Sequence, residues 1–259
     1  MRVDVSGTAL AAGAVNKPLG THTSRTIMLH EVRGLLAHVD CDADYAAYAS
    51  AATDLNAVQK ATLTTRKKTL RHLRELYALN PSVPVFSALR TLWDHETAAQ
   101  PLLAGLCAVA RDPVLRCTLA RVVELRPGEE TTPGALAAVV AESFPGHYGP
   151  DVTARIGRNI ASSWAQTGLL TGRTRKVRTH PCVTATTVAY ALFLAHLCGG
   201  RGDMLFSSLW SRMLDTPIPE LRSLASAAAR QGWLEYRESG GVTEVTFRHF
   251  ERLLLERKL

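Results

Sequence analysis

The sequence predicts a mainly α-helical protein, with a helical bundle followed by a winged-helix-like half that carries short β-hairpins. Two observations support this fold class. In the first half, apolar residues recur at helical spacing, and no segment alternates apolar and polar residues as a strand would. Near the C-terminus, the amphipathic segment 219–231 is followed by two short β-type runs that flank Gly240-Gly241. This is the order of a winged helix, and a simple α+β cap would show the same order.

A segment rich in proline and glycine divides the chain. Residues 143–150 contain two prolines and two glycines, which is typical of linkers. We therefore expect a helical bundle domain over residues 25–146 and a winged-helix-like domain over residues 147–259. Residues 1–24 are rich in small and polar side chains and have no steady period, which predicts a flexible N-terminal arm.

The individual helices are predicted from the Pro, Gly, Asp and Thr residues that bound them. In the bundle we expect helices over residues 24–39, 45–52, 54–79, 85–95, 98–111, 113–125 and 132–144, the third with Asp54 as its N-cap. In the second half we expect helices over residues 151–167 (capped by Asp151), 184–198, 204–214 and 219–231. A short β or loop segment is expected over 169–181, and strands over 233–238 and 242–247.

Composition excludes several classes of protein. Hydrophobic residues make up 46% of the 259-residue chain, too many for a disordered protein. The five cysteines are scattered, as expected of reduced thiols in the cytoplasm. The longest apolar runs span about ten residues, whereas a membrane-spanning helix needs about 20. We expect a cytoplasmic protein without membrane contact, and its net charge of +7 favours a polyanionic partner.

Motifs of catalysis and cofactor binding are absent from the sequence. It contains no G-x-x-x-x-G-K-[ST], no G-x-G-x-x-G and no G-x-S-x-G pattern. Two His/Cys pairs, at 180/182 and 196/198, lack the Cys spacing of structural zinc sites. We therefore expect no catalytic residue, no metal and no cofactor.

A first basic cluster lies in the predicted helix 54–79. Its cations share one short stretch with no acid before Glu75, and they are Arg66, Lys67, Lys68, Arg71 and Arg74. Such a run is ordinarily a solvated helix face. However, like charges one turn apart repel each other, so exposed helices usually mix both signs. A ridge of one sign therefore favours contact with phosphates.

A second basic cluster covers residues 151–178 and is opposed only by Asp151, which leaves a net charge of +5. Its cations are Arg155, Arg158, Arg173, Arg175, Lys176 and Arg178. The first two lie near the start of a predicted helix, beside the polar residues Asn159, Ser162, Ser163 and Gln166, which are of types that bind phosphates and base edges. The loop 172–178 suits a wing along a phosphate backbone. The alternative is an edge strand protected by its cations.

Neither cluster has an aromatic platform for stacking, because Trp164, the aromatic residue within 151–178, is at a helical position that predicts burial in the core. Proteins that bind single strands, and many that bind RNA, place aromatic side chains among the basic ones. Duplex DNA is therefore the favoured polyanion.

The sequence resembles the BrxA proteins of BREX phage-defence loci over residues 25–247. The likeness is one of pattern, and it rests on segments 65–77, 100–104, 111–115, 162–170, 220–225 and 232–236. It implies a small, mainly helical, non-catalytic protein with winged-helix-like parts that binds double-stranded DNA. Such a protein accompanies other defence proteins, including a methyltransferase.

Charge and resemblance together predict a component of a BREX-like defence system that binds duplex DNA, mainly through phosphates. Two other functions remain open. A protein-interaction adaptor would use the same charge for solubility or for an acidic partner. An RNA-binding helical module is favoured if the bundle presents the first cluster alone.

Overall fold

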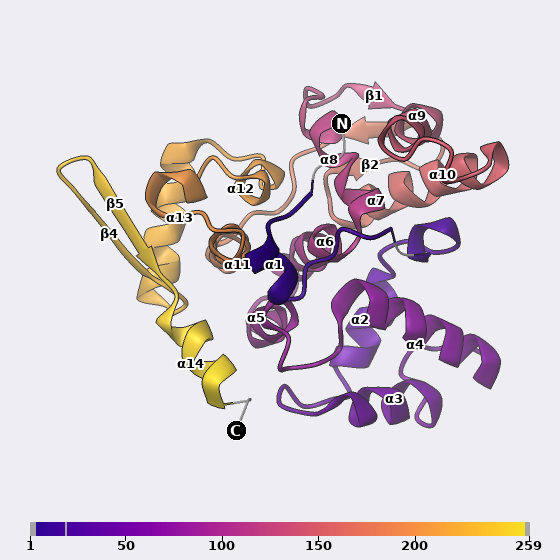
Figure 1. Ribbon diagram of the computed structural model, residues 1–259, viewed down its shortest axis with the longest axis horizontal. Coiled ribbons are helices and arrows are strands. Elements are labelled where there is room, and N and C mark those ends of the chain that lie inside the picture. Colours follow the sequence, from indigo (N-terminus) through magenta and orange to yellow (C-terminus); the bar gives the residue numbers. More distant parts are fainter. Residues whose placement is uncertain (1–3, 19, 257–259) are drawn as a thin grey trace.

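The computed structural model describes residues 4–18 and 20–256 (Figure 1). The chain is mainly helical and has two small antiparallel sheets, as predicted. Three groups of elements surround a centre formed by α5 (Pro84–Trp93), α6 (Gln100–Arg111) and α11 (Ala185–Leu197). Nearly every residue of α6 and α11 is buried. A helix that is apolar on all sides must be enclosed by others, which explains why these two lie at the centre.

The first group contains α2 (Leu29–Leu36), α3 (Tyr45–Thr53) and α4 (Leu63–Tyr77). The N-cap of helix α4 is Thr62, eight residues later than the predicted cap Asp54, and the Thr62 Oγ1 accepts a hydrogen bond from the Thr65 amide. The residues before it cannot be helical, because Asn56 and Gln59 have positive φ angles. The predicted N-cap Asp54 instead follows the last residue of α3.

The second group follows α6 and contains one of the two sheets. Its elements are α7 (Pro113–Arg116), α8 (Leu119–Val123), β1 (Glu130–Thr131), α9 (Pro133–Ser143), α10 (Pro150–Gln166), β2 (Leu170–Thr171) and β3 (Lys176–Arg178). The strands are antiparallel, with β3 between β1 and β2. The N-cap of α10 is Gly149, two residues earlier than the cap predicted from the sequence. The C-cap is Thr167, and the expected cap Gly168 is the next residue, with the positive φ angle typical of that position.

The third group contains η3 (Gly202–Leu205), α12 (Leu209–Met213), α13 (Ile218–Arg230), β4 (Glu235–Ser239), β5 (Val242–Thr246) and α14 (Arg248–Glu256). The predicted hairpin is confirmed, with Gly240 and Gly241 at its turn, both at positive φ. Figure 1 shows this hairpin projecting from the rest of the molecule.

A single cluster of buried hydrophobic residues runs from Ile27 to Phe250. It includes side chains from all three groups, so the predicted domains 25–146 and 147–259 share one core. The predicted arm is packed as well. It forms α1 (Gly7–Ala11) and the 3₁₀ turn η1 (Thr21–Thr23), and it buries His22 completely. Residues 1–3 and 19 lie outside the described residues. For residues 20–24 the prediction of a flexible arm is therefore corrected.

Helices α9 and α10 approach each other closely at Gly157. A Cβ atom added there would lie 2.2 Å from the Pro133 carbonyl oxygen and 2.8 Å from the Ala137 Cβ. We expect Gly157→Ala to lower the free energy of unfolding by about 1–3 kcal/mol in urea titrations, because the two backbones must separate. Gly134→Ala, in α9, meets only an ordinary contact of 3.7 Å and should not destabilise. Equal stability of the two variants would contradict this packing.

Candidate nucleic-acid interface

The cations of α4 divide into structural and exposed ones. Arg66 is half-buried and ties down the loop before the helix, because its Nε donates to the Lys60 carbonyl (3.0 Å) and its Nη1 to that of Thr53 (2.9 Å). The guanidinium of Arg74 lies 4.3 Å from the ring centre of Tyr45 on α3. Lys67, Lys68, Arg71 and Arg74 are exposed, and Arg71 also makes a loose ion pair of 3.8 Å with Glu75. Four of the five predicted contacts therefore reach the surface.

Helix α10 exposes both of its arginines. Its buried residues, among them Ile156 and Trp164, face the core. Arg155 and Arg158 are exposed and form no ion pair with any described carboxylate. The nearest acid in sequence is Asp151, one turn before Arg155 and also exposed. The N-terminal half of α10 therefore presents cations to solvent.

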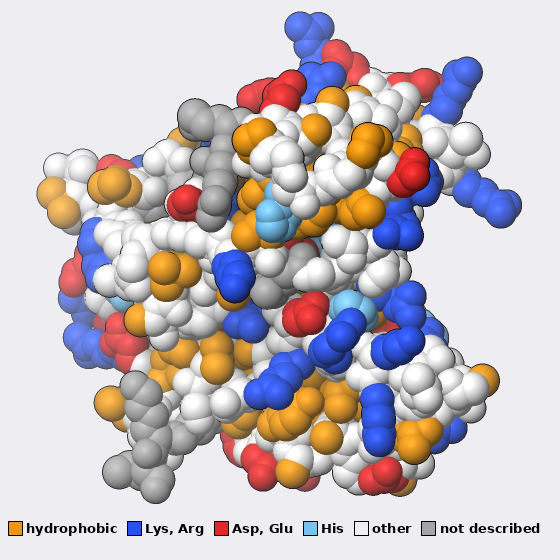
Figure 2. Space-filling view, turned by 45° about the vertical axis from the view of Figure 1, so that its right-hand side comes forward, with side chains coloured by type: hydrophobic (Ala, Val, Ile, Leu, Met, Phe, Trp, Pro, Cys, Tyr) orange, Lys and Arg blue, Asp and Glu red, His pale blue; other side chains and the backbone are white. Residues whose placement is uncertain are grey.

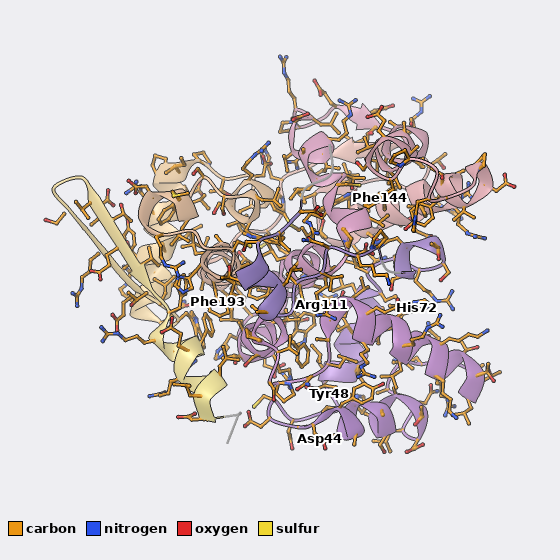
Figure 3. The ribbon with its side chains drawn as sticks, viewed as in Figure 1. Asp44, Tyr48, His72, Arg111, Phe144 and Phe193 are labelled. Atoms are coloured by element: carbon orange, nitrogen blue, oxygen red, sulfur yellow. The ribbon has the colours of Figure 1, made fainter. Side chains whose placement is uncertain are left out.

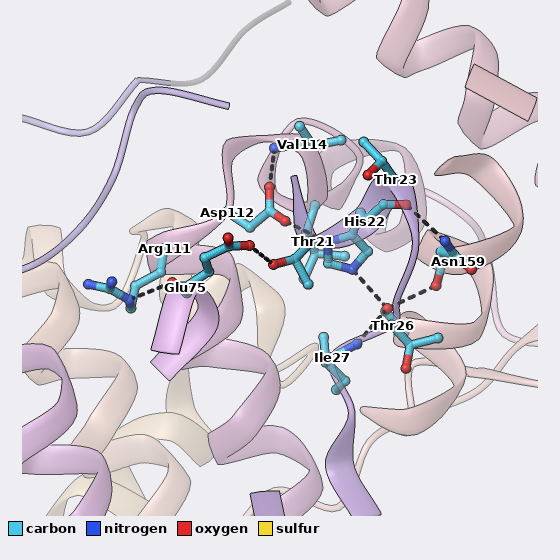
Figure 4. A network of polar contacts seen from close by, with 12 residues as sticks. Thr21, His22, Thr23, Thr26, Ile27, Glu75, Arg111, Asp112, Val114 and Asn159 are labelled. Atoms are coloured by element: carbon cyan, nitrogen blue, oxygen red, sulfur yellow. Dashed lines mark hydrogen bonds and ion pairs between the residues drawn. The ribbon is translucent and has the colours of Figure 1, made fainter. Parts of the chain in front are cut away.

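The turn η1 connects α4 with α10 through side-chain hydrogen bonds (Figure 4). On one side, the Thr21 hydroxyl donates to Glu75 Oε2 of α4 (2.5 Å) and lies 3.3 Å from His72 Nδ1. On the other side, His22 Nε2 lies 2.9 Å from Ser163 Oγ, and Asn159 Nδ2 donates to the His22 carbonyl at 2.9 Å. Two consecutive residues thus hold two helices that are about 90 positions apart in sequence.

This connection brings the two basic clusters together. Lys68 precedes His72 by one turn of α4, and Arg155 precedes Asn159 by one turn of α10, so each cation lies on the face that contacts η1. Figure 1 shows the N-terminal halves of both helices extending to the same side of the molecule. In Figure 2 the surface is hollowed between them, and Lys and Arg side chains gather on both walls. We call this hollow the basic notch; α4, which carries Lys68 and Arg71, forms one wall, and α10, which carries Arg155 and Arg158, forms the other.

Sequence reasoning missed Arg25. It follows Ser24, whose Oγ lies 3.4 Å from His72 Nε2, so it belongs to the segment between the two walls. Its Nη1 donates to the Ser24 carbonyl at 3.2 Å. In the sequence it falls within the predicted helix 24–39, outside both basic clusters.

The polar side chains of α10 are used inside the protein. Ser163 Oγ accepts from the Ile27 amide, Gln166 Oε1 from the Leu29 amide, and Asn159 binds His22 as described. The expectation that these residues contact base edges is therefore corrected. The groups of α10 that stay available to a partner are its exposed, positively charged arginines.

His22 also lies beside Asp112, with 2.5 Å between Nδ1 and Oδ2. The order Asp112, His22, Ser163 matches the acid, base and nucleophile of a hydrolase triad. All three side chains are buried, however, and Ser163 Oγ donates to the Asn159 carbonyl at 2.9 Å. A substrate cannot reach this serine, so the arrangement is structural.

The loop between β2 and β3 carries two exposed arginines and precedes two buried cations. Arg173 is exposed, and Arg175 makes only a loose pair of 3.7 Å with Glu130. Lys176 Nζ donates to the Gly172 carbonyl at 2.6 Å, and its side chain is buried. Arg178 is buried too and forms an ion pair of 2.8 Å with Asp215. The assignment of Lys176 and Arg178 as DNA contacts is therefore corrected, because neither reaches the surface.

Glu75 is the acid nearest to the basic notch. Burial alone would raise the pKa of its carboxyl, but hydrogen bonds from His72 and Thr21 and the charge of Arg71 hold the pKa below its ordinary value of 4.5. The carboxylate is thus engaged by His72 and Thr21, and it also makes a loose ion pair of 3.8 Å with Arg71.

Comparisons with protein-family models and with curated proteins give no match. Within residues 4–18 and 20–256, no three or more His, Cys, Asp and Glu side chains form a group that could hold a metal ion. In the same part of the chain, no helix has the length and apolar character needed to cross a membrane.

The burial of Arg178 predicts a large stability cost on its removal. Besides pairing with Asp215, it donates to the carbonyls of Val122, Leu169 and Thr179. We expect Arg178→Met to lose about 3 kcal/mol in urea titrations, because a carboxylate and several carbonyls lose their donor. Arg173→Met should change stability by less than about 0.5 kcal/mol. Similar losses in both variants would show that Arg178 is not structural.

The lowered pKa of Glu75 predicts a pH dependence. The folded chain binds this proton less readily than the unfolded chain, so the stabilisation is complete above the ordinary pKa of 4.5 and is lost as the pH falls below it. Glu75→Gln should therefore be less stable than the wild type at neutral pH, with a difference that shrinks on acidification. Unfolding titrations across this range measure it, with the exposed Glu142→Gln as control. A difference independent of pH would contradict the assignment.

Proposed function

We propose that the protein is a non-catalytic double-stranded DNA-binding protein that contacts its target mainly through backbone phosphates. The observation that carries this proposal is the basic notch, in which α4 and α10 contribute cations to opposite walls of one hollow. Cations gathered along one surface attract a polyanion and release its counterions, which is the principal source of sequence-independent affinity.

The topology of the second group supports a winged helix at this place. Helix α8, strand β1, helices α9 and α10, and the hairpin of β2 and β3 follow the order of that fold, with β3 in the middle of the sheet. In this proposal α10 is the recognition helix and residues 172–175 are the wing. The exposed Arg155, Arg158, Arg173 and Arg175 would then bind one duplex.

The C-terminal hairpin is a poorer candidate for contact with DNA. Strands β4 and β5 carry Glu235, Glu238 and Glu244 against a single cation, Arg237. Glu238 pairs with Arg222 at 2.5 Å. Phosphates would be repelled by the remaining acids, so the charge favours α10 and the first hairpin over α13 and the second.

Sequence preference should be weak. The polar side chains of α10 that could contact base edges bind residues 22–29 instead. Arginine contacts to phosphates position a protein on a duplex and carry no base information of their own. The proposed protein therefore binds duplexes of different sequence alike.

The resemblance to BrxA proteins places this activity, as part of the proposal, in the cytoplasm, within a BREX-like defence system that includes a methyltransferase. A role as an adaptor without DNA affinity and a role as an RNA-binding module are outcomes that the following experiment separates.

Fluorescence anisotropy with a labelled duplex at several salt concentrations tests the proposal. If about five phosphates are neutralised, log Kd should change with log salt by a slope of magnitude near 4.5. Replacing one cation on each wall, Arg71→Gln with Arg155→Gln, should reduce that magnitude by about 2 and weaken binding to every sequence.

The matched control removes two exposed charges elsewhere, Arg230→Gln with Arg237→Gln, and should leave the slope nearly unchanged. Binding that ignores salt would favour the adaptor. Tighter competition by duplex RNA than by duplex DNA would favour the RNA-binding module. Equal effects of the two double variants would remove the basic notch from the proposal.

A further inference from the structure

A cavity of about 600 Å³ lies between α8, α12 and the start of α13, and none of its lining residues is assigned to DNA contact. Its volume falls within the range of about 300–1,000 Å³ that is usual for small-molecule sites. The described function makes no use of it.

One part of the cavity is apolar. Val123, Phe206 and Leu221 line it, and Ile218 stands at the same cavity with 45% of its surface exposed. Few large hydrophobic side chains are exposed among the described residues. Ile218 is one of them, and the contact of this apolar surface with water is unfavourable. An aromatic or branched aliphatic body of a ligand would cover it favourably.

The other part of the cavity is lined by polar side chains that ion pairs hold in place. Asp215 holds a positive φ of 52°, a strained conformation for a residue other than glycine. In this conformation its Oδ2 lies 2.8 Å from the buried guanidinium of Arg178 and 2.8 Å from His180 Nδ1. On a protonated ring both nitrogens are donors, so with Nδ1 beside the carboxylate the Nε2–H of His180 is left to donate to a ligand.

The charge of these side chains favours an anionic ligand. Asp215 is already paired with Arg178, whereas Arg212 lines the same cavity, is exposed and forms no ion pair with a described carboxylate. The two arginines and the one carboxylate leave one positive charge, and a protonated His180 adds a second. A guanidinium beside an imidazole suits a carboxylate or a phosphate.

We propose that this cavity binds a small amphipathic anion, a carboxylate or phosphate monoester on an aromatic or branched aliphatic body. The anion binds Arg212 and His180, and the body packs on Phe206, Leu221 and Ile218. Because Arg178 connects Asp215 to β3, the site adjoins the strand that follows the loop carrying Arg173 and Arg175.

Isothermal titration with 4-phenylbutyrate and with phenyl phosphate tests this site on the full chain. We expect saturable one-site binding of at least one probe at millimolar concentration or below, and binding about tenfold weaker for the neutral 4-phenylbutan-1-ol. The probe that binds more tightly identifies the anion as a carboxylate or a phosphate.

Two variants locate the site. Arg212→Gln removes the proposed anion contact, and Ile218→Asp places a negative charge at the apolar part while leaving α13 with a favourable acidic first turn. Each should raise the Kd about tenfold. Arg230→Gln, on α13 outside the cavity, should leave it unchanged, and circular dichroism confirms that all three fold. Absence of saturable binding by both probes, or equal affinity of Arg212→Gln and Arg230→Gln, overturns the proposal.

Discussion

The interface depends on one constraint, which is that His22 cannot leave the interior without breaking several hydrogen bonds at once. Its ring lies between Asp112 and Ser163, its carbonyl accepts from Asn159, and its neighbour Thr21 binds Glu75. Each of these groups is buried or half-buried, and a buried polar group left without its partner costs about 1–3 kcal/mol. The η1 segment therefore fixes the position of α4 relative to α10, and with it the separation of the two basic walls (Figures 3 and 4).

This arrangement explains how one surface is assembled from parts of the chain that are distant in sequence. Like charges on α4 and α10 repel each other, and the hydrogen bonds of η1, together with the shared hydrophobic core, hold the two helices in place against this repulsion. These bonds use neutral groups and Glu75, so Lys68, Arg155 and Arg158 stay exposed without an ion pair to a described carboxylate. A polyanion bound between the two walls would reduce the repulsion between their cations. We therefore regard the charge of the walls and the arrangement of their helices as one feature.

Local patterns predicted most helices and the C-terminal hairpin, because capping residues and apolar spacing act over a few residues. They failed for α4, whose start depends on the positive φ angles of Asn56 and Gln59. They also failed to predict which single basic side chains are buried. Lys176 and Arg178 alternate along β3 toward the interior, a period of two that was visible in the sequence, but the carboxylate that receives Arg178 is Asp215, far along the chain. The burial of Arg66 and of His22 likewise depends on partners elsewhere in the chain, so no local pattern predicts it.

Amide hydrogen exchange with and without a saturating duplex at low salt tests the central claim most directly, because it shows which surface the duplex covers. The account predicts protection at three places together: the first turns of α10, residues 63–71 of α4, and the loop 172–175. Protection of only one of the two helices, or protection confined to α13 and the β4–β5 hairpin, would show that the basic notch is not the binding surface.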